Sequence, residues 1–212
     1  MSGAASYAMR GNLYERRFKR AFDIAAAAAG LVVLSPVLLA VAAAMKLMDP
    51  GPIFFSQTRI GLGSKPFKMF KFRTMRAGAA GPQITAGADA RVTRLGRLLR
   101  RAKLDELPQL FNVLRGDMSV VGPRPEVPRY VELFKNDYEF ILSVKPGLTD
   151  YAAVKYRDEE AALAAYRDAE EGYVTKVLPD KIVLYRRYID DVRFSTDVRI
   201  ILATASKIFA GG

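Results

Sequence analysis

The 212-residue sequence contains no cysteine and no histidine. These absences exclude disulfide bonds, thiolate nucleophiles and metal sites built on Cys or His ligands. They also remove the imidazole group, the usual general base near neutral pH. Chemistry in this chain must therefore use carboxylates, Lys, Arg, Tyr or hydroxyl groups. The metals that suit such ligands are hard, oxygen-seeking cations, above all Mg²⁺.

Acidic residues are few relative to basic ones. The chain carries 33 Lys and Arg against 22 Asp and Glu, which gives a formal net charge of +11. Such a charge attracts phosphate groups on nucleic acid, anionic lipid or a nucleotide, and it does not distinguish among them. Hydrophobic residues make up 50% of the chain, so it can form one folded domain plus a membrane element.

An uncharged apolar run extends from Ile24 to Met45, between Asp23 and Lys46. As a helix it would measure roughly 33 Å at ~1.5 Å per residue, about the thickness of the hydrocarbon core of a bilayer. A cleaved signal peptide is disfavoured because the run is too long for one. Basic residues flank both sides of the run, so both ends favour the cytoplasmic side of a membrane.

The dipeptide Ser35-Pro36 lies in the middle of this run. Proline removes one backbone hydrogen bond and clashes with the carbonyl four residues back, and the Ser35 hydroxyl can satisfy a carbonyl freed in this way. A helix broken here can enter the bilayer, turn, and leave on the face from which it came. A kinked helix that spans the bilayer fits the same residues, so the residues alone leave both alternatives open.

The rest of the chain predicts an α+β fold that is mostly helical with a small β-hairpin. A Gly-rich link at 61–64 joins two aromatic runs, 53–60 and 67–75, which is typical of a hairpin. Residues 91–103 have Arg at steps of three, which predicts a basic amphipathic helix close to anionic headgroups. We expect a frayed terminus at 1–12, loops at 77–90 and 122–125, a turn at 145–147, and helices at 105–114, 127–142, 159–173, 180–188 and 196–209.

Two adjacent carboxylates, Asp105 and Glu106, follow the basic helix directly. If Asp105 opens the next helix, the spare N–H groups of that helix face the carboxylates and any phosphate brought to them. A divalent cation can hold one carboxylate while the other attacks phosphorus. The alternative is structural: Asp105 caps a helix and Glu106 is a solvated acid.

Several basic residues can complete a phosphate site. Lys71 and Arg73 share one face of the second predicted strand. Arg124 stands between two prolines, so its direction is set with little entropy to lose. Arg100 either contacts phosphate or pairs with the neighbouring acids. No Gly-rich phosphate loop of the dinucleotide or Walker type is present, which disfavours an ordinary ATPase or dehydrogenase.

In their order along the chain these motifs resemble those of one family, the monotopic phosphoglycosyl transferases, also called bacterial sugar transferases. The resemblance covers about residues 20–160, and the run from Asp105 to Pro125 is its most specific part. The matching segments are Ser35-Pro36, Gly51-Pro52-Ile53-Phe54-Phe55-Ser56-Gln57-Thr58-Arg59-Ile60-Gly61, Phe70-Lys71-Phe72-Arg73-Thr74-Met75, Leu104-Asp105-Glu106-Leu107-Pro108-Gln109-Leu110 with Asn112-Val113-Leu114, Gly116-Asp117-Met118-Ser119, Val121-Gly122-Pro123-Arg124-Pro125 and Lys145-Pro146-Gly147-Leu148-Thr149.

The resemblance implies an enzyme that moves a sugar 1-phosphate from a UDP-sugar to undecaprenyl phosphate and releases UMP. The implied mechanism is ping-pong, through an aspartyl phosphosugar intermediate, as the first membrane step of glycoconjugate assembly. It also implies a three-part chain: an N-terminal segment (1–22), a re-entrant membrane helix (23–48) broken at Ser35-Pro36, and a catalytic domain (49–212) on the cytoplasmic face of the bacterial inner membrane. The long amino-terminal membrane region of larger members is absent, so the chain resembles the minimal catalytic form.

Site roles follow from the same resemblance. It implies Asp105 as the nucleophile, Glu106 as its Mg²⁺-associated partner, and Lys71, Arg100 and Arg124 as supporting cations. The chain departs from the family pattern after the Lys-Pro-Gly turn, where an Asn-Gly-Arg triplet is common and Lys155-Tyr156-Arg157 stands here. We expect Arg157 to keep a phosphate-binding role there, and Arg73 to assist.

Two functions of other classes compete with this enzyme. One is a non-catalytic basic membrane scaffold that binds anionic lipid or partner proteins. The other is a nucleic-acid binder, which the apolar run and the lack of a known binding module disfavour. For the enzyme, the expected partners are a UDP-sugar, polyprenol phosphate, anionic lipid headgroups and downstream glycosyltransferases, with no nucleic acid.

Overall fold

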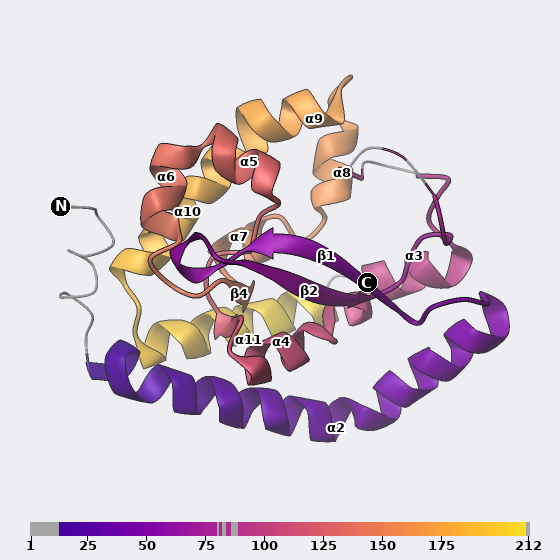
Figure 1. Ribbon diagram of the computed structural model, residues 1–212, viewed down its shortest axis with the longest axis horizontal. Coiled ribbons are helices and arrows are strands. Elements are labelled where there is room, and N and C mark those ends of the chain that lie inside the picture. The colour runs from indigo at the N-terminus through magenta and orange to yellow at the C-terminus, as the bar shows by residue number, and fades with distance from the viewer. Residues whose placement is uncertain (1–12, 80, 82–83, 86–88, 211–212) are drawn as a thin grey trace.

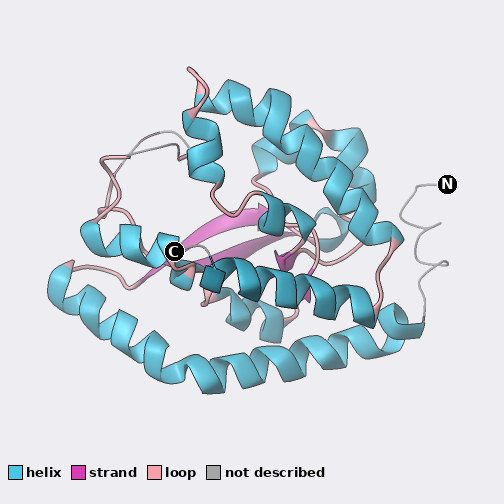
Figure 2. Ribbon diagram, turned by 180° about the vertical axis from the view of Figure 1, so that it is seen from behind, coloured by secondary structure: helices cyan, strands magenta, loops and turns pink. Residues whose placement is uncertain are grey.

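A long helix, α2 (Lys19–Met48), runs along one side of a mostly helical domain (Figure 1). The computed structural model describes residues 13–79, 81, 84–85 and 89–210, so the frayed terminus predicted for 1–12 lies outside the described residues. Seen from behind, the C-terminal helix α11 (Phe194–Ala210) crosses the near face of the domain above α2 (Figure 2). The predicted α+β class with mainly helical content is confirmed.

Two small sheets supply the β part of the described structure. The predicted hairpin is confirmed: β1 (Phe54–Ile60) pairs antiparallel with β2 (Pro66–Phe72). A second sheet, which the sequence did not reveal, pairs β3 (Ser119–Val121) in parallel with β4 (Gly147–Thr149). Its strands meet closely at Gly122 and Gly147, because a Cβ added to Gly147 would lie 2.1 Å from the Gly122 nitrogen.

Several predicted helices differ in their bounds. The predicted helix at 127–142 is wrong as a single element, because the backbone at Phe134 leaves the helical region and divides it. The predicted helix at 105–114 begins later, because Pro108 stands at the N-cap of α4 and the two acids lie in a separate 3-10 turn, η3 (Leu104–Glu106). The remaining helices are α3 (Arg94–Arg101), α4 (Gln109–Arg115), α5 (Pro128–Leu133), α6 (Lys135–Ile141), α7 (Tyr151–Lys155), α8 (Glu159–Ala164), α9 (Ala169–Gly172) and α10 (Leu178–Asp190), with π-helical turns η1 (Tyr14–Phe18) and η4 (Tyr173–Val177) and a 3-10 turn η2 (Leu62–Ser64).

Proline interrupts the hydrogen bonding of α2 without ending the helix. The Ser35 hydroxyl donates to the carbonyl of Val32 at 2.8 Å, and Val32 lies four residues before Pro36. That carbonyl is the one that loses its N–H donor when proline occupies position 36. The predicted hydrogen bond of Ser35 to a freed carbonyl is therefore present, and α2 continues through Pro36 as one helix that curves around the domain (Figure 1). A re-entrant path through a membrane stays a prediction. Among the described residues, α2 is the one helix long and apolar enough to cross a membrane.

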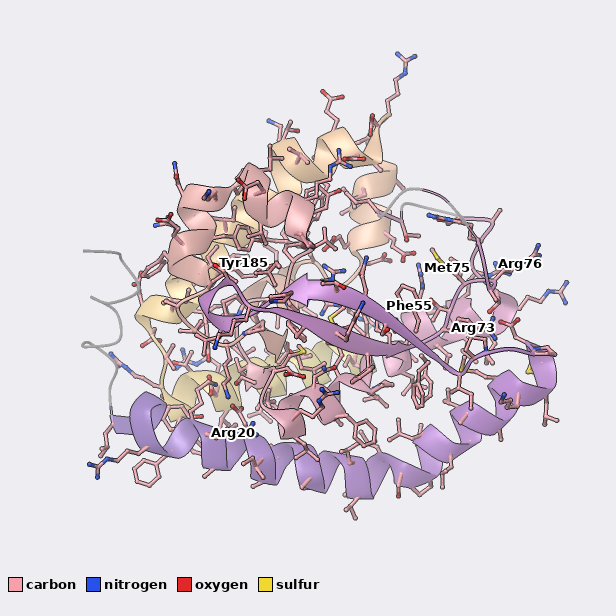
Figure 3. The ribbon with its side chains drawn as sticks, viewed as in Figure 1. Arg20, Phe55, Arg73, Met75, Arg76 and Tyr185 are labelled. Carbon is pink, nitrogen blue, oxygen red and sulfur yellow. The ribbon has the colours of Figure 1, made fainter. Side chains whose placement is uncertain are left out.

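Polar side chains attach α2 to the domain. The buried carboxylate of Asp23 accepts hydrogen bonds from the Ser119 hydroxyl at 2.9 Å and the Val120 amide at 3.0 Å. The Arg20 guanidinium points from α2 to α4 (Figure 3) and donates to the carbonyls of Val113 at 2.6 Å and Leu114 at 2.8 Å. Since the last carbonyls of a helix have no partner within it, Arg20 caps α4 and fixes it against α2.

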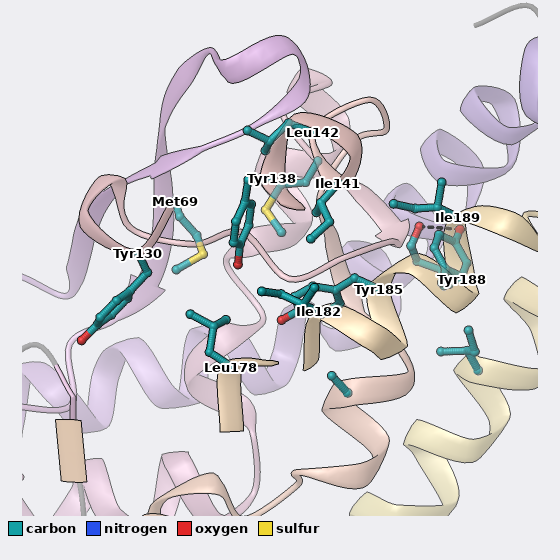
Figure 4. Packing of buried hydrophobic residues seen from close by; sticks show 14 of the residues in the cluster. Met69, Tyr130, Tyr138, Ile141, Leu142, Leu178, Ile182, Tyr185, Tyr188 and Ile189 are labelled. Atoms are coloured by element: carbon teal, nitrogen blue, oxygen red, sulfur yellow. Dashed lines mark hydrogen bonds between the residues drawn. The ribbon is translucent and has the colours of Figure 1, made fainter. Parts of the chain in front are cut away.

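The main hydrophobic core lies among the helices of the C-terminal half and the two sheets. Tyrosines supply much of its volume, and Figure 4 shows Tyr138 and Tyr185 among aliphatic side chains such as Ile182, with Tyr188 beside Ile189. A second, smaller cluster joins α2 to β2 and α3 through Val41, Met45, Phe72 and Leu99. This second cluster matters for function because Phe72 follows Lys71 directly and Leu99 precedes Arg100.

Candidate active site

One cavity of about 1500 Å³ collects the charged residues that the sequence singled out. It lies between the hairpin, α3, the η3 turn and the helices α7, α8 and α10. All seven predicted charged residues line it: Lys71, Arg73, Arg100, Asp105, Glu106, Arg124 and Arg157. Segments far apart in sequence therefore meet at this site, while the role of each residue in chemistry stays a prediction.

Glu106 is held by two cations. Its Oε1 accepts from the Lys71 ammonium at 3.0 Å, and both oxygens accept from the two prongs of the Arg124 guanidinium, with Nη1 to Oε2 at 3.0 Å. Burial alone would raise the pKa of Glu106, but the charges of Arg124 and Lys71 together hold it well below its usual range. Glu106 is therefore a carboxylate held in a fixed position in its ionised form.

The neighbouring carboxylate has the opposite environment. Asp105 is 6% exposed, and none of the described residues donates a hydrogen bond to it or forms an ion pair with it. Burial raises the pKa of Asp105, the charge of Glu106 raises it further, and the positive charge of Lys71 partly offsets both. Asp105 thus combines high basicity with oxygens that face no competing donor, which is what a nucleophilic carboxylate requires.

Local backbone geometry explains how adjacent acids acquire such different surroundings. Lys103, just before the η3 turn, has a left-handed backbone with φ of 55°, which is uncommon for a residue with a side chain. This conformation ends α3 and reverses the chain into the turn. Leu104 then packs against the small cluster that joins α2, β2 and α3. The turn therefore presents Asp105 and Glu106 to the cavity in different directions.

The backbone of Arg124 is anchored by Asp150. Its amide donates to the Asp150 carboxylate at 2.8 Å, and Asp150 also caps α7 by accepting from the Ala153 amide at 2.6 Å. The Gly122 to Gly147 approach fixes the other side of the loop. These two backbone contacts place the guanidinium of Arg124 beside Glu106. Burial lowers the pKa of Arg124, but the charge and hydrogen bonds of Glu106 have the larger effect and raise it.

Arg100 enters the cavity from α3. A Cβ added to Gly96 would lie 2.1 Å from the Thr74 carbonyl oxygen, so only glycine lets α3 lie this close to the end of the hairpin. Arg100 Nε donates to the Thr74 hydroxyl at 2.8 Å and its Nη1 pairs with Glu160 at 2.6 Å. Arg100 thus forms its ion pair with Glu160, and the predicted alternative of a pair with Asp105 or Glu106 is wrong.

Arg73 and Arg157 lie at other parts of the cavity wall. Arg73 is 7% exposed, and its guanidinium donates to the carbonyls of Pro52 at 2.7 Å and Asp49 at 2.6 Å, where it joins the end of α2 to the hairpin. Figure 3 shows it beside Phe55 and Met75. Arg157 follows α7 and approaches the carbonyl of Ile208 on α11 at 3.4 Å. Phosphate binding by either residue stays a prediction.

The structure adds residues that the sequence reasoning missed. Lys103 lines the cavity and its charge lowers the pKa of Glu106, after the larger effects of Arg124 and Lys71. Lys181 on α10 also lines the cavity, and its side chain is only 4% exposed. A signal for Lys181 was present, because at helical spacing it shares one face with the buried Tyr185 and Tyr188. Asp150 carried no signal beyond that of an N-cap residue.

The carboxylates of the site fit a hard cation only in part. Asp105 has unpaired oxygens, and Glu106 Oε2 accepts a single hydrogen bond, so each can offer a lone pair. Among the described residues there is no group of three or more acidic, Cys or His side chains that could hold a metal ion. Mg²⁺ is commonly bound by one or two carboxylates together with substrate phosphates. The donor set therefore fits Mg²⁺ brought with a diphosphate.

Comparisons with known proteins identify the family of this chain. Residues 14–211 match the model of the family described as bacterial sugar transferase. The chain is 38% identical over 198 residues to a UDP-N-acetylgalactosamine-undecaprenyl-phosphate N-acetylgalactosaminephosphotransferase of Aeromonas hydrophila, covering 91% of this chain and 44% of that protein. It is 38% identical over 200 residues to a UDP-glucose:undecaprenyl-phosphate glucose-1-phosphate transferase of Escherichia coli K12, covering 92% of this chain and 40% of that one.

A shorter relative matches over most of its own length. The uncharacterized sugar transferase EpsL of Bacillus subtilis is 36% identical over 190 residues, which cover 90% of this chain and 86% of that protein. The two transferases above are longer, and this chain spans less than half the length of either. With its family model matched over nearly the whole chain, this protein belongs to the bacterial sugar transferase family.

Proposed function

We propose that this chain is a phosphoglycosyl transferase that moves a sugar 1-phosphate from a UDP-sugar to undecaprenyl phosphate and releases UMP. The observation that carries the proposal is the contrast within one cavity between an unpaired buried carboxylate and an adjacent clamped one, surrounded by cations. The names of the relatives supply the substrate classes, a UDP-sugar and undecaprenyl phosphate. Which sugar is transferred is left to experiment.

The first half-reaction uses Asp105 as the nucleophile. One of its oxygens forms a bond to the phosphorus that carries the sugar, and the bridging P–O bond to the uridine-bearing phosphate breaks. The bridging oxygen takes the electron pair and leaves as part of UMP. Arg124 and Lys71 keep Glu106 ionised and in place beside the reacting carboxylate, and Arg100 contacts phosphate oxygens. Glu106 and the donor diphosphate would hold Mg²⁺, which would supply positive charge that offsets the charge of the leaving group.

The second half-reaction regenerates the enzyme. A phosphate oxygen of the polyprenol phosphate attacks the same phosphorus, and the bond to Asp105 breaks, which returns the carboxylate. The product is a polyprenol diphosphate sugar, the first membrane-bound intermediate of a polysaccharide or glycoprotein glycan. Because one site serves both substrates in turn, we expect ping-pong kinetics. Downstream glycosyltransferases would then extend the product.

Membrane attachment belongs to the same proposal. We infer that α2 enters the cytoplasmic face of the inner membrane and leaves on that face, with Ser35 supporting the proline-containing turn and basic residues at anionic headgroups. The chain has no cysteine, so any labelling of a variant by a maleimide comes from the introduced cysteine. In cells, L13C and S64C should both react with an impermeant maleimide only after the membrane is opened. Labelling of one of them in intact cells would instead indicate a spanning helix.

The reaction is tested by UMP release from purified protein. A panel of UDP-sugars is incubated with polyprenol phosphate and Mg²⁺, and the D105N variant serves as the matched control. We expect UMP release with at least one UDP-sugar, dependence on Mg²⁺, and no release by D105N. A non-catalytic scaffold would release no UMP with any donor while still binding vesicles that contain anionic lipid.

A further inference from the structure

A second pair of adjacent acids, Glu159 and Glu160, lines the same cavity as Asp105 and Glu106. These residues are the first two of α8, and each pairs with a cation that lines the cavity. Glu159 pairs with Lys181 of α10, and Glu160 pairs with Arg100 of α3 at 2.6 Å. Two consecutive residues therefore bring together cations from elements that are far apart in sequence.

The cations are more buried than the acids that neutralise them. The side chain of Lys181 is 4% exposed and that of Glu159 is 32% exposed. The same order holds for Arg100 at 21% and Glu160 at 40%. A buried ammonium needs a negative partner, and here that partner reaches inward from the rim. The positive charges are thus built into the domain, while the negative charges come from a peripheral element.

Helix α8, which carries Glu159 and Glu160, buries little of its surface against the domain. α8 is six residues long, and Leu163 is its one buried residue. By contrast, Lys181 stands on the 13-residue helix α10, whose face beside it includes Tyr185 and Tyr188. Lys181 also lies over the ring of Tyr173 with its nitrogen 4.9 Å from the ring centre. The acids can therefore move away at lower cost than the cations can.

A diphosphate has the chemistry to replace the two acids. It carries at least two negative charges and several acceptor oxygens, and phosphate pairs with guanidinium through two parallel hydrogen bonds and with ammonium as a point charge. We propose that Lys181 is a further binding residue for the donor diphosphate, acting with Arg100, and that Glu159 and Glu160 occupy the places of the diphosphate oxygens until the donor binds. This inference rests on the proposed function, because it takes the donor to be a nucleoside diphosphate sugar.

Donor binding then becomes an exchange of partners. The diphosphate accepts the hydrogen bonds of Lys181 and Arg100, and the carboxylates of Glu159 and Glu160 turn to solvent with the first turn of α8. No covalent bond changes in this step. The exchange keeps the buried Lys181 neutralised in both states, and it makes the acids competitors of the donor. Removing the competitors should strengthen donor binding, which is the opposite of what loss of a structural ion pair would do.

The test measures UDP binding by titration calorimetry to the purified chain in nanodiscs. The E159Q/E160Q variant should bind UDP about two- to fivefold more tightly than wild type, because partly exposed ion pairs of this kind are weak competitors. The K181M variant should bind UDP at least about tenfold more weakly, since it loses a charge-assisted contact. UMP should gain less from E159Q/E160Q than UDP does, because one phosphate cannot take both places.

The matched control is E170Q. Glu170 lies in the next helix, α9, and pairs with Arg129 outside the cavity, so this change breaks one ion pair and removes one negative charge in the same region. We expect E170Q to bind UDP like wild type. If E159Q/E160Q binds UDP no more tightly than E170Q does while UDP-sugar turnover is normal, the inference is wrong and the proposed function stands. Failure of the wild-type protein to bind UDP would overturn both.

Discussion

Two pairs of adjacent acids face the same cavity, and they differ in almost everything except residue type. Asp105 and Glu106 lie in a turn enclosed by the hairpin, α3 and α4. Asp105 has no hydrogen-bond or ion-pair partner among the described residues, whereas Glu106 has two cations. Glu159 and Glu160 begin a short peripheral helix, and each has one cation. The first pair is asymmetric and buried, whereas the second is symmetric and half exposed.

The difference teaches that surroundings, and not the carboxylates themselves, assign chemical roles. A carboxylate paired with a cation is a poor nucleophile because its lone pairs are occupied. Asp105 escapes pairing because Glu106 takes both Lys71 and Arg124. In the second pair both Glu159 and Glu160 are paired with a cation. These carboxylates can therefore neutralise positive charge, but neither is left unpaired to form a bond. The predictions below test this contrast.

The largest effect should come from removing the unpaired carboxylate. The D105N variant should lose at least about 1000-fold in UMP release, because the amide cannot form the phosphosugar bond. Circular dichroism and vesicle binding should match the wild type. Turnover within tenfold of wild type would contradict the assignment of the nucleophile.

Removing the clamp on Glu106 should have the next largest effect. We expect R124M to lower kcat about 100-fold, because Glu106 loses its two-pronged partner and the phosphate site loses a positive charge. The matched variant R124K restores charge without the fork, so it should recover only part of the loss. Steady-state UMP release measures kcat for both variants. Full recovery of kcat in R124K would show that the two-pronged geometry of the Arg124–Glu106 pair is unimportant.

The two adjacent carboxylates should affect stability in opposite directions. E106Q removes the partner of two partly buried cations, Lys71 and Arg124. This loss of about 3 kcal/mol should lower Tm by about 6–12 °C at pH 7. D105N removes an unpaired buried charge and should raise Tm by about 2–4 °C. Thermal melts in detergent measure both shifts.

The pH dependence of those shifts follows from the pKa directions. Burial raises the folded-state pKa of Asp105, so its ionisation costs stability as pH rises above about 3.9, the ordinary Asp value. The gain from D105N should therefore be small near pH 4 and should grow as pH rises through the raised pKa of Asp105. Glu106 has a lowered pKa, so its contribution is present above about pH 4.3 and is lost as pH falls. Parallel pH curves for the two variants would contradict the contrast.

The smallest of these effects should come from the positioning residue behind Arg124. D150A frees the backbone of Arg124 and should lower kcat about tenfold. With Arg124 less well placed, the pKa of Glu106 rises, so the acidic limb of the kcat/KM profile should move to higher pH. A Tm decrease without movement of that limb would mean that Asp150 only caps α7.

Sequence reasoning recovered the local features of this fold and missed the long-range ones. The hairpin and the helix-breaking loop at Arg124 follow from glycine, proline and strand periodicity, which act within a few residues. The parallel sheet of β3 and β4 was missed, because its three-residue strands carry no pattern and are fixed by the approach of Gly122 to Gly147. The division at Phe134 was missed for a similar reason, since no glycine or proline marks it.

The same division holds for the candidate site. The resemblance named Asp105, Glu106, Lys71, Arg100 and Arg124, and all of them line one cavity. Pairing could not be read from the residues, because the choice of Glu160 as the partner of Arg100 depends on where α8 lies. The left-handed backbone at Lys103 was equally hidden, since lysine carries no preference for that conformation. The sequence thus indicates which residues belong to the site, whereas the tertiary structure determines which of them pair with one another.

The most direct test is the mass of the protein after reaction with the donor alone. Wild-type protein incubated with its UDP-sugar and Mg²⁺, without polyprenol phosphate, should gain the mass of one sugar phosphate on Asp105 and release about one UMP per chain. Addition of polyprenol phosphate should then remove the adduct. An unmodified Asp105 during normal turnover, or an adduct that persists in D105N, would contradict the account.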